Sequence, residues 1–164
     1  MLNPDISKAS KTSADTNSLR LEIEIGANYN EVFAALVDLE SRKYYFDGVK
    51  DVSHILPMTI IGMKFKCVFN AFEMEVEPMS IEIKENEIKY AEYIRIPQMD
   101  LHSVYHIYLT YLDAWRCTFV VQIYPEERYS LTSEQRGFLK QFQETSMDNL
   151  KVFAENGFQL VDHS

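Results

Sequence analysis

Hydrophobic and polar residues alternate along most of the chain between residues 19 and 124. A period of two places alternate side chains on opposite faces of a strand, so this pattern predicts half-buried strands. The first strand is Leu19–Ile25, where leucine and isoleucine alternate with arginine and glutamate. Further strands are predicted over Val49–Leu56, Met63–Phe69, Phe72–Ile83, Ile88–Ile94, Leu101–Leu112 and Trp115–Tyr124. We therefore expect about seven strands.

Two short helices are predicted between the first and second strands. The first begins after Asn28, with Glu31 three positions later in a spacing that resembles a capping box. Its apolar face consists of Val32, Phe33, Leu36 and Val37. The second helix is expected over Leu39–Phe46, and Asp47-Gly48 ends it.

The longest helix is predicted at the end of the chain, over Leu131–Asn156. Thr132 or Ser133 can cap its start, and Gly157 is a natural stop. At about 1.5 Å per residue it is long enough to cross a small domain. This order of elements predicts an α+β fold, in which a curved antiparallel sheet of about seven strands wraps around the C-terminal helix.

A change of register is predicted at Pro78. The apolar residues of that strand are even-numbered before the proline and odd-numbered after it, as expected for a β-bulge or sharp bend. Upstream, a turn at Asn70-Ala71 would place Lys66 opposite Glu75, and Lys64 opposite Glu77.

The turn near Asp113 decides which residues of Leu101–Leu112 face inward. A two-residue turn pairs Thr110 with Cys117 and places His106, Tyr108 and Thr110 inside. A three-residue turn pairs Tyr111 with Cys117 and places Tyr105, Ile107, Leu109 and Tyr111 inside. The second arrangement buries more apolar area and leaves His106 in water, so we prefer it.

Composition narrows the class of protein. The 164 residues suit one domain, and 46% are hydrophobic, which supplies a substantial core. The formal net charge of −9 disfavours binding to nucleic acid and to anionic membranes. No stretch approaches the roughly 20 apolar residues of a membrane-spanning helix, and residues 1–8 lack the pattern of a signal peptide. Cys67 and Cys117 are expected to be buried, reduced thiols of a cytoplasmic protein.

The order of motifs resembles the START-like, polyketide-cyclase and birch-pollen-allergen superfamily, also called SRPBCC, which has the helix-grip fold. The resemblance spans roughly Leu19 to Glu155. It rests on the strand-to-helix entry over residues 23–38, and on Gly48-Val-Lys-Asp-Val52, Ile61-Gly62-Met63 and Leu150-Lys-Val-Phe-Ala-Glu155. The resemblance implies one START-like domain over residues 18–164. Residues 1–17 are polar without apolar periodicity, which predicts a flexible tail. It also implies an apolar ligand held between the sheet and the long helix, as members bind lipids, hormones or polyketides and only some are enzymes.

Glu92 is the most informative candidate residue. It shares a strand face with Ile88, Tyr90 and Ile94, which should point toward the helix. If it is buried without a partner, desolvation favours its protonated form and it can act as an acid or base. If the strand flares at this end, Glu92 reaches water. The rarity of unpaired buried charges favours the second interpretation.

Other candidates are weaker signals. The tyrosines of the inner strand faces can offer hydroxyl groups to a ligand, or can simply be amphipathic wall residues. The full set of predicted ligand-binding residues is Tyr90, Glu92, Tyr105, Tyr111, Phe142, Phe65 and Met74. His102 and His106 lie four positions apart on one strand, about 13 Å, which is too far to share a metal ion. No metal site and no cofactor are predicted.

Three functions remain open. The first is binding of a hydrophobic small molecule or lipid between sheet and helix, by a protein that is a monomer or weak homodimer. The second is an enzyme of the cyclase or dehydratase type, with Glu92 or a tyrosine as general acid or base. The third, by resemblance only, is a protein-interaction module like the chaperone activators of the superfamily. A closed interior and an exposed apolar patch would favour the third function.

Overall fold

The computed structural model describes residues 18–53 and 58–159. The predicted tail over residues 1–17 lies outside the described residues, as does the end of the predicted Val49–Leu56 strand. No helix among the described residues is long and apolar enough to cross a membrane.

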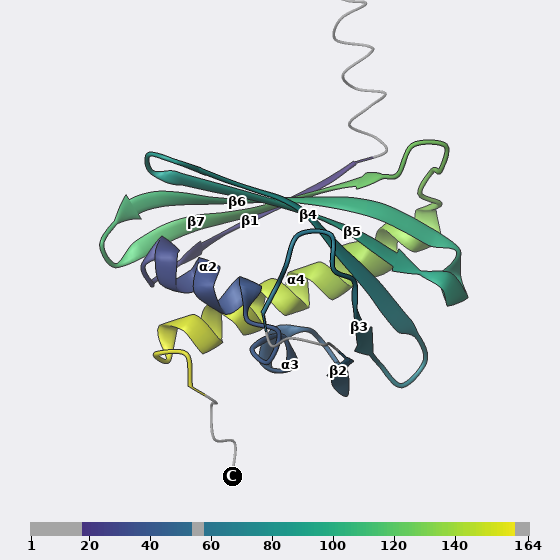
Figure 1. Cartoon of the computed structure of the whole chain (residues 1–164), viewed down its shortest axis with the longest axis horizontal. Coiled ribbons are helices and arrows are strands. Elements are labelled where there is room, and N and C mark those ends of the chain that lie inside the picture. The colour runs from purple at the N-terminus through teal and green to yellow at the C-terminus, as the bar shows by residue number, and fades with distance from the viewer. Residues whose placement is uncertain (1–17, 54–57, 160–164) are drawn as a thin grey trace, which may run out of the picture.

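A seven-stranded antiparallel sheet forms one side of the molecule (Figure 1). The strands are β1 (Leu19–Ile25), β2 (Asp51–Ser53), β3 (Phe65–Val68), β4 (Glu73–Lys84), β5 (Glu87–Ile96), β6 (Leu101–Asp113) and β7 (Arg116–Pro125). They are ordered β1-β7-β6-β5-β4-β3-β2, so the six strands from β2 to β7 form a meander and β1 pairs with the last of them. The predicted number of strands and their antiparallel arrangement are confirmed.

The helices lie on one side of this sheet. They are α2 (Tyr29–Val37), α3 (Arg42–Tyr45) and α4 (Ser133–Glu155), and the 3-10 helix η1 (Pro97–Met99) joins β5 to β6. Figure 1 shows α4 running diagonally beneath the curved sheet, with α2 and α3 on the same side. The core therefore lies between the inner face of the sheet and these helices.

The helix caps follow the sequence closely. Thr132 and Gln135 form a complete capping box at α4, each side chain bonding the other's backbone N–H at 3.0 Å. At α2 only the Asn28 half of the expected box is present, since the Asn28 side chain accepts from Asn30 N. The Asn28 amide also donates to Ala114 O at 3.2 Å, which fixes the start of α2 against the β6–β7 turn.

The predicted registers are confirmed at two places. The pairing of β4 with β5 shifts between Pro78 and Ser80, as the change of parity indicated. Tyr111 pairs with Cys117, as the three-residue turn requires. The prediction that His106 lies in water is wrong in part. The side chain faces outward but is half-buried, and its ring centre lies 5.6 Å from that of Tyr124.

The expected charge pairs on the outer face of β3 and β4 need one correction. Lys66 lies opposite Glu75 in the register, but its ammonium contacts Glu73 at 3.6 Å. A lysine side chain is long enough to reach this diagonal neighbour on the adjacent strand. Lys64 lies just before β3 and its ammonium comes within 3.9 Å of Glu77.

Helix α4 is bonded to strand β1 through side chains as well as through the core. Arg136 donates to Ser18 O at 2.6 Å, and Lys151 donates to Glu24 O at 2.8 Å. Glu155 accepts from Gly26 N at 2.7 Å. These three bonds hold the two ends of α4 against the strand that completes the sheet.

Candidate functional site

Glu92 is buried in an ion pair with Arg42. The two guanidinium nitrogens Nη1 and Nη2 of Arg42 donate to the two carboxylate oxygens of Glu92, at 3.2 and 2.9 Å. Arg42 is 0% exposed and Glu92 is 1% exposed. The expectation that Glu92 reaches water is therefore wrong. Its partner comes from α3, 50 positions earlier in the chain, and satisfies the rule that buried charges are paired.

Aromatic side chains surround this ion pair. The Arg42 guanidinium lies 5.1 Å from the Phe46 ring centre and 4.9 Å from the Phe65 ring centre. Tyr90 donates its hydroxyl hydrogen to Glu92 Oε2 at 2.6 Å. Burial lowers the pKa of Arg42, but the Glu92 carboxylate together with Tyr45 and Tyr90 outweighs that effect and holds the pKa well above its ordinary value. Arg42 is therefore always charged, and both oxygens of Glu92 have donors.

A small cavity lies beside the ion pair, between the sheet and α4. Its volume is about 10 Å³, close to the minimum that one water molecule needs. The sheet contributes Glu92, Tyr105, Ile107 and Phe119, the α2–α3 segment contributes Leu36, Arg42, Tyr45 and Phe46, and α4 contributes Gln143, Ser146, Met147 and Leu150. The interior is therefore nearly filled by side chains.

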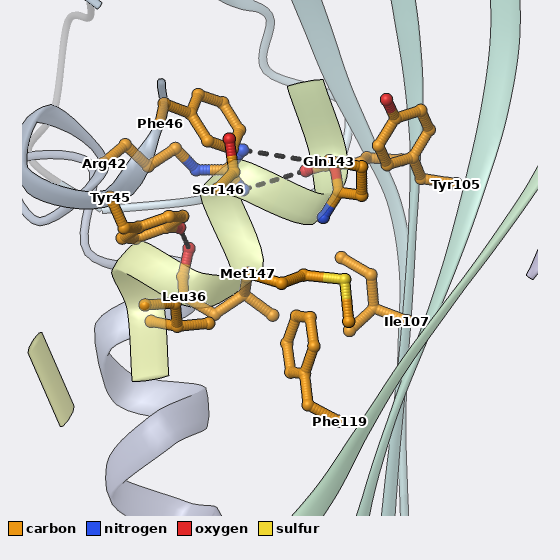
Figure 2. A pocket seen from close by; sticks show the side chains of 12 residues that line it. Leu36, Arg42, Tyr45, Phe46, Tyr105, Ile107, Phe119, Gln143, Ser146 and Met147 are labelled. Carbon is orange, nitrogen blue, oxygen red and sulfur yellow. Dashed lines mark hydrogen bonds and ion pairs between the residues drawn. The ribbon is translucent and has the colours of Figure 1, made fainter. Parts of the chain in front are cut away.

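Three polar atoms among the cavity-lining residues are buried without a hydrogen-bond partner. They are Nε of Arg42, the hydroxyl of Tyr105 and Oε1 of Gln143. Figure 2 shows these side chains arriving from α3, β6 and α4 around one space. Burial, and then the charge of Glu92, raise the pKa of Tyr105, so its hydroxyl keeps its proton and remains a donor. The cluster thus presents both donors and an acceptor.

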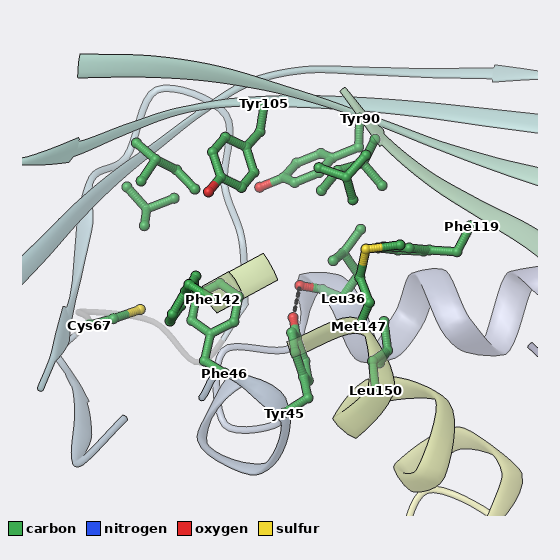
Figure 3. Packing of buried hydrophobic residues seen from close by; sticks show 14 of the residues in the cluster. Leu36, Tyr45, Phe46, Cys67, Tyr90, Tyr105, Phe119, Phe142, Met147 and Leu150 are labelled. Atoms are coloured by element: carbon green, nitrogen blue, oxygen red, sulfur yellow. Dashed lines mark hydrogen bonds between the residues drawn. The ribbon is translucent and has the colours of Figure 1, made fainter. Parts of the chain in front are cut away.

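The other predicted ligand-binding residues occupy different places. Tyr90 and Tyr105 extend side by side from the sheet toward the helices (Figure 3). Phe65 packs on the Arg42 guanidinium, and Met74 is fully buried in the core. Phe142 is buried among phenylalanine rings. Tyr111 is 38% exposed at the end of the sheet, where its ring meets the edge of Tyr29.

The α3 residues of the cavity could not be identified from the sequence, and from α4 the predicted Phe142 does not line it, whereas Gln143, Ser146, Met147 and Leu150 do. One signal was available, because Gln143 lies four residues after Leu139 and seven before Leu150, on the apolar stripe of α4. A glutamine at such a position is a candidate buried polar group. Arg42 gave no comparable signal, since the predicted short helix did not indicate which way its side chain points.

This geometry holds Glu92 as a paired carboxylate. Its Oε1 accepts from Arg42, and its Oε2 accepts from both Arg42 and Tyr90. Burial and the neighbouring Glu92 charge raise the pKa of Tyr90, which makes its phenolate inaccessible as a base at neutral pH. Among the described residues, no group of three histidine, cysteine, aspartate or glutamate side chains is placed to hold a metal ion.

The sheet, its bulge at Pro78, the two short helices and the long final helix together make up the helix-grip fold. This is the fold of the START-like, polyketide-cyclase and birch-pollen-allergen superfamily. The resemblance seen in the sequence is thus confirmed at the level of fold.

Solved structures support this assignment of the fold. The chain is similar to hypothetical protein jhp0584 from Helicobacter pylori, with a TM-score of 0.66 and 15% identity over 84% of this chain and 88% of that chain. It is similar to Aha1 from Colwellia psychrerythraea, which was solved as a dimer. The TM-score is 0.64 and the identity 14%, over 87% of this chain and 98% of that chain. It is also similar to a norcoclaurine synthase point mutant from Thalictrum flavum, which was solved with a transition-state analogue. The TM-score is 0.61 and the identity 11%, over 87% of this chain and 96% of that chain.

No protein-family model and no curated protein sequence matches the chain. Identities of 11–15% establish the shared fold alone.

Proposed function

We propose that this protein binds a small, mainly apolar molecule between the sheet and α4, with one hydrogen-bonding group of the molecule placed at Arg42, Tyr105 and Gln143. The observation that carries this proposal is that three residues lining one cavity each have a buried polar atom without a partner. A buried polar atom without a partner costs about 1–3 kcal/mol, so three in one place form an unfavourable arrangement for a core that only packs. A ligand that supplies partners relieves this cost.

The apolar part of such a ligand would gain most of its affinity from burial, at about 25 cal/mol per Å². Because the cavity holds about 10 Å³, entry of a ligand requires side chains to move. Met147 lines the cavity and Leu36 faces it from α2. Methionine has three rotatable bonds and adapts to new contacts at low cost, so Met147 is the side chain that we expect to shift first.

A second candidate is a protein-interaction module, and the same small volume favours it. The interior is nearly filled, and two large apolar side chains are strongly exposed, with Trp115 at 79% and Ile83 at 70%. Both lie near the hairpin ends of the sheet. The unpartnered polar atoms nevertheless favour ligand binding, because an interaction module has no need of them.

We further propose that the protein works in a reducing compartment such as the cytoplasm. Cys67 and Cys117 are both free, buried thiols, which supports this location.

Native mass spectrometry of freshly purified protein tests the proposed function. We expect an added mass from a bound apolar molecule. Replacement of Tyr105 by phenylalanine should reduce its occupancy, whereas Tyr108→Phe, which changes a half-buried tyrosine on the outer face, should leave it unchanged. Protein without any added mass, and without binding to a panel of apolar alcohols and amides, would contradict ligand binding and favour the interaction module.

Stability measurements on ligand-free protein provide an independent check. Removing an unpartnered hydroxyl should cost nothing, so ligand-free Tyr105→Phe should unfold at the same temperature as the wild type or higher. A clear loss of stability would show that the Tyr105 hydroxyl already has a partner, and would remove the basis of the proposal.

A further inference from the structure

An open groove runs along the N-terminal half of α4, on the outside of the molecule. It consists of two adjoining hollows of about 570 and 280 Å³, and Phe138 lines both. The larger hollow lies between η1 and the start of α4, and the smaller lies between α4 and the segment before β4. Either is far larger than the interior cavity, and the larger falls within the range of small-molecule sites.

Phenylalanine rings form the apolar wall of this groove. Phe138 meets the edge of Phe72 at 5.5 Å and stacks with Phe142 at 5.9 Å. Phe72 in turn stacks on Phe69 at 4.4 Å. These contacts hold the wall in a fixed arrangement, and Phe72 and Phe138 each remain partly exposed.

The rim of the groove is negative. Among the residues that line the two hollows, Asp47, Asp100 and Glu134 are acidic, and none is lysine or arginine. The backbone N–H of Asp47 donates to Ser146 at 3.1 Å, which fixes this acid beside α4. Asp100 Oδ1 lies 3.1 Å from Nε2 of the His102 ring.

The N-terminus of α4 opposes this charge only in part. A helix N-terminus carries about half a positive charge, against three carboxylates on the rim. The Thr132–Gln135 capping box already uses N–H groups of the first turn, and Glu134 lies in that turn. The residues that line the groove therefore carry a net negative charge beside an aromatic wall.

From this combination we propose that the groove binds an organic cation, namely a protonated amine carried on an aromatic or alkyl body. The body would pack on the phenylalanine wall, and the ammonium would interact with ring faces and with the carboxylates of the rim. A neutral molecule would keep only the apolar contacts, and an anion would be repelled. The site lies outside the core and does not depend on the function proposed for the interior.

Titration followed by NMR tests the proposal on the full chain. The probes are 2-phenylethylammonium, the neutral 2-phenylethanol and the anionic 3-phenylpropionate, which share a similar body and differ in charge. We expect backbone shifts centred on Gly137 and Phe138, with the cation binding more tightly than the alcohol and the carboxylate binding least. Raising the salt concentration should weaken binding of the cation and leave the alcohol unchanged.

Matched variants test whether the acidic rim and the phenylalanine wall of the groove contribute to binding. Glu134→Gln and Asp100→Asn should each weaken cation binding about 2–5-fold, the range of exposed ion pairs. Glu144→Gln, an exposed acid on the same helix outside the groove, should have no effect. Phe138→Ala should weaken binding of both the cation and the alcohol, with Val152→Ala as the control for an exposed apolar residue of α4.

Three results would overturn the proposal. One is equal affinity for the cation and the alcohol, which removes the role of charge. Another is a set of shifts centred on Tyr105 and Gln143, which places the probe in the interior. The last is an absence of shifts at Gly137 and Phe138 up to saturating amounts of the amine.

Discussion

Replacement of Glu92 by leucine tests the buried ion pair most directly. Leucine is close to glutamate in size but cannot accept a hydrogen bond, so it leaves the Arg42 guanidinium buried without a counter-charge. It also removes the acceptor of the Tyr90 hydroxyl. Breaking a buried pair by removing one partner typically costs about 3–5 kcal/mol, a large share of the stability of a small domain, which is about 5–15 kcal/mol.

The double variant Arg42→Met, Glu92→Leu isolates the origin of this cost. It removes the stranded charge and takes from the Tyr90 hydroxyl its Glu92 acceptor, at a cost of about 1–3 kcal/mol. The double variant should therefore be more stable than Glu92→Leu alone. Adding Tyr90→Phe should bring the stability close to that of the wild type, because well-packed apolar groups can replace a buried ion pair at little cost.

Urea unfolding followed by far-UV circular dichroism measures these differences. With a urea m-value of about 2 kcal/mol per M, a loss of 3–5 kcal/mol lowers the midpoint by about 1.5–2.5 M. An unchanged midpoint for Glu92→Leu would refute the reasoning, since the Arg42 charge would then be solvated. A double variant no more stable than Glu92→Leu would show that lost packing, not the unpaired charge, sets the cost.

Three further outcomes follow from the titratable groups. The hydrogen bond from Lys151, and then that from Gly26 N, lower the pKa of Glu155; its contribution is present above the ordinary pKa of about 4.5 and is lost as the pH falls further. Glu155→Gln should thus cost at most about 1 kcal/mol in urea unfolding at pH 7, and nothing in acid. Burial raises the pKa of Cys67 to about 12, so this thiol should resist alkylation at pH 8 until urea unfolds the protein, and its burial should cost stability above about pH 9. Burial lowers the pKa of His106 below 6.5, so stability should fall as the pH drops through that value, and His106→Gln should reduce this dependence in thermal unfolding.

Much of the fold could be predicted from local patterns. The apolar residues change from even-numbered to odd-numbered positions at Pro78, and this change located the bulge. Successive residues of a strand point to opposite faces, and the extra residue of a bulge reverses that order. The burial of apolar area selected the pairing of Tyr111 with Cys117. Both inferences depend on residues near one another in the chain, where periodicity carries most of the information.

The candidate site could be predicted only in part. Glu92 was identified as unusual because it interrupts an apolar strand face, but its partner depends on how α3 docks against β5. That docking is set by packing between segments 50 residues apart, and no periodicity encodes it. Tyr111 shows a different limit. It faces inward and its ring meets Tyr29 at the start of α2, yet it is 38% exposed, so facing alone does not give burial.

The side-chain bonds from α4 to β1 have a consequence for self-association. Strand β1 lies at one edge of the sheet, and such an edge offers unpaired backbone groups to another copy of the chain. Arg136, Lys151 and Glu155 occupy backbone groups at Ser18, Glu24 and Gly26, at both ends of that edge. A movement of α4 that widens the interior for a ligand would also break these side-chain bonds and free the edge of β1. Widening of the interior and edge-to-edge aggregation are therefore expected to depend on the same helix.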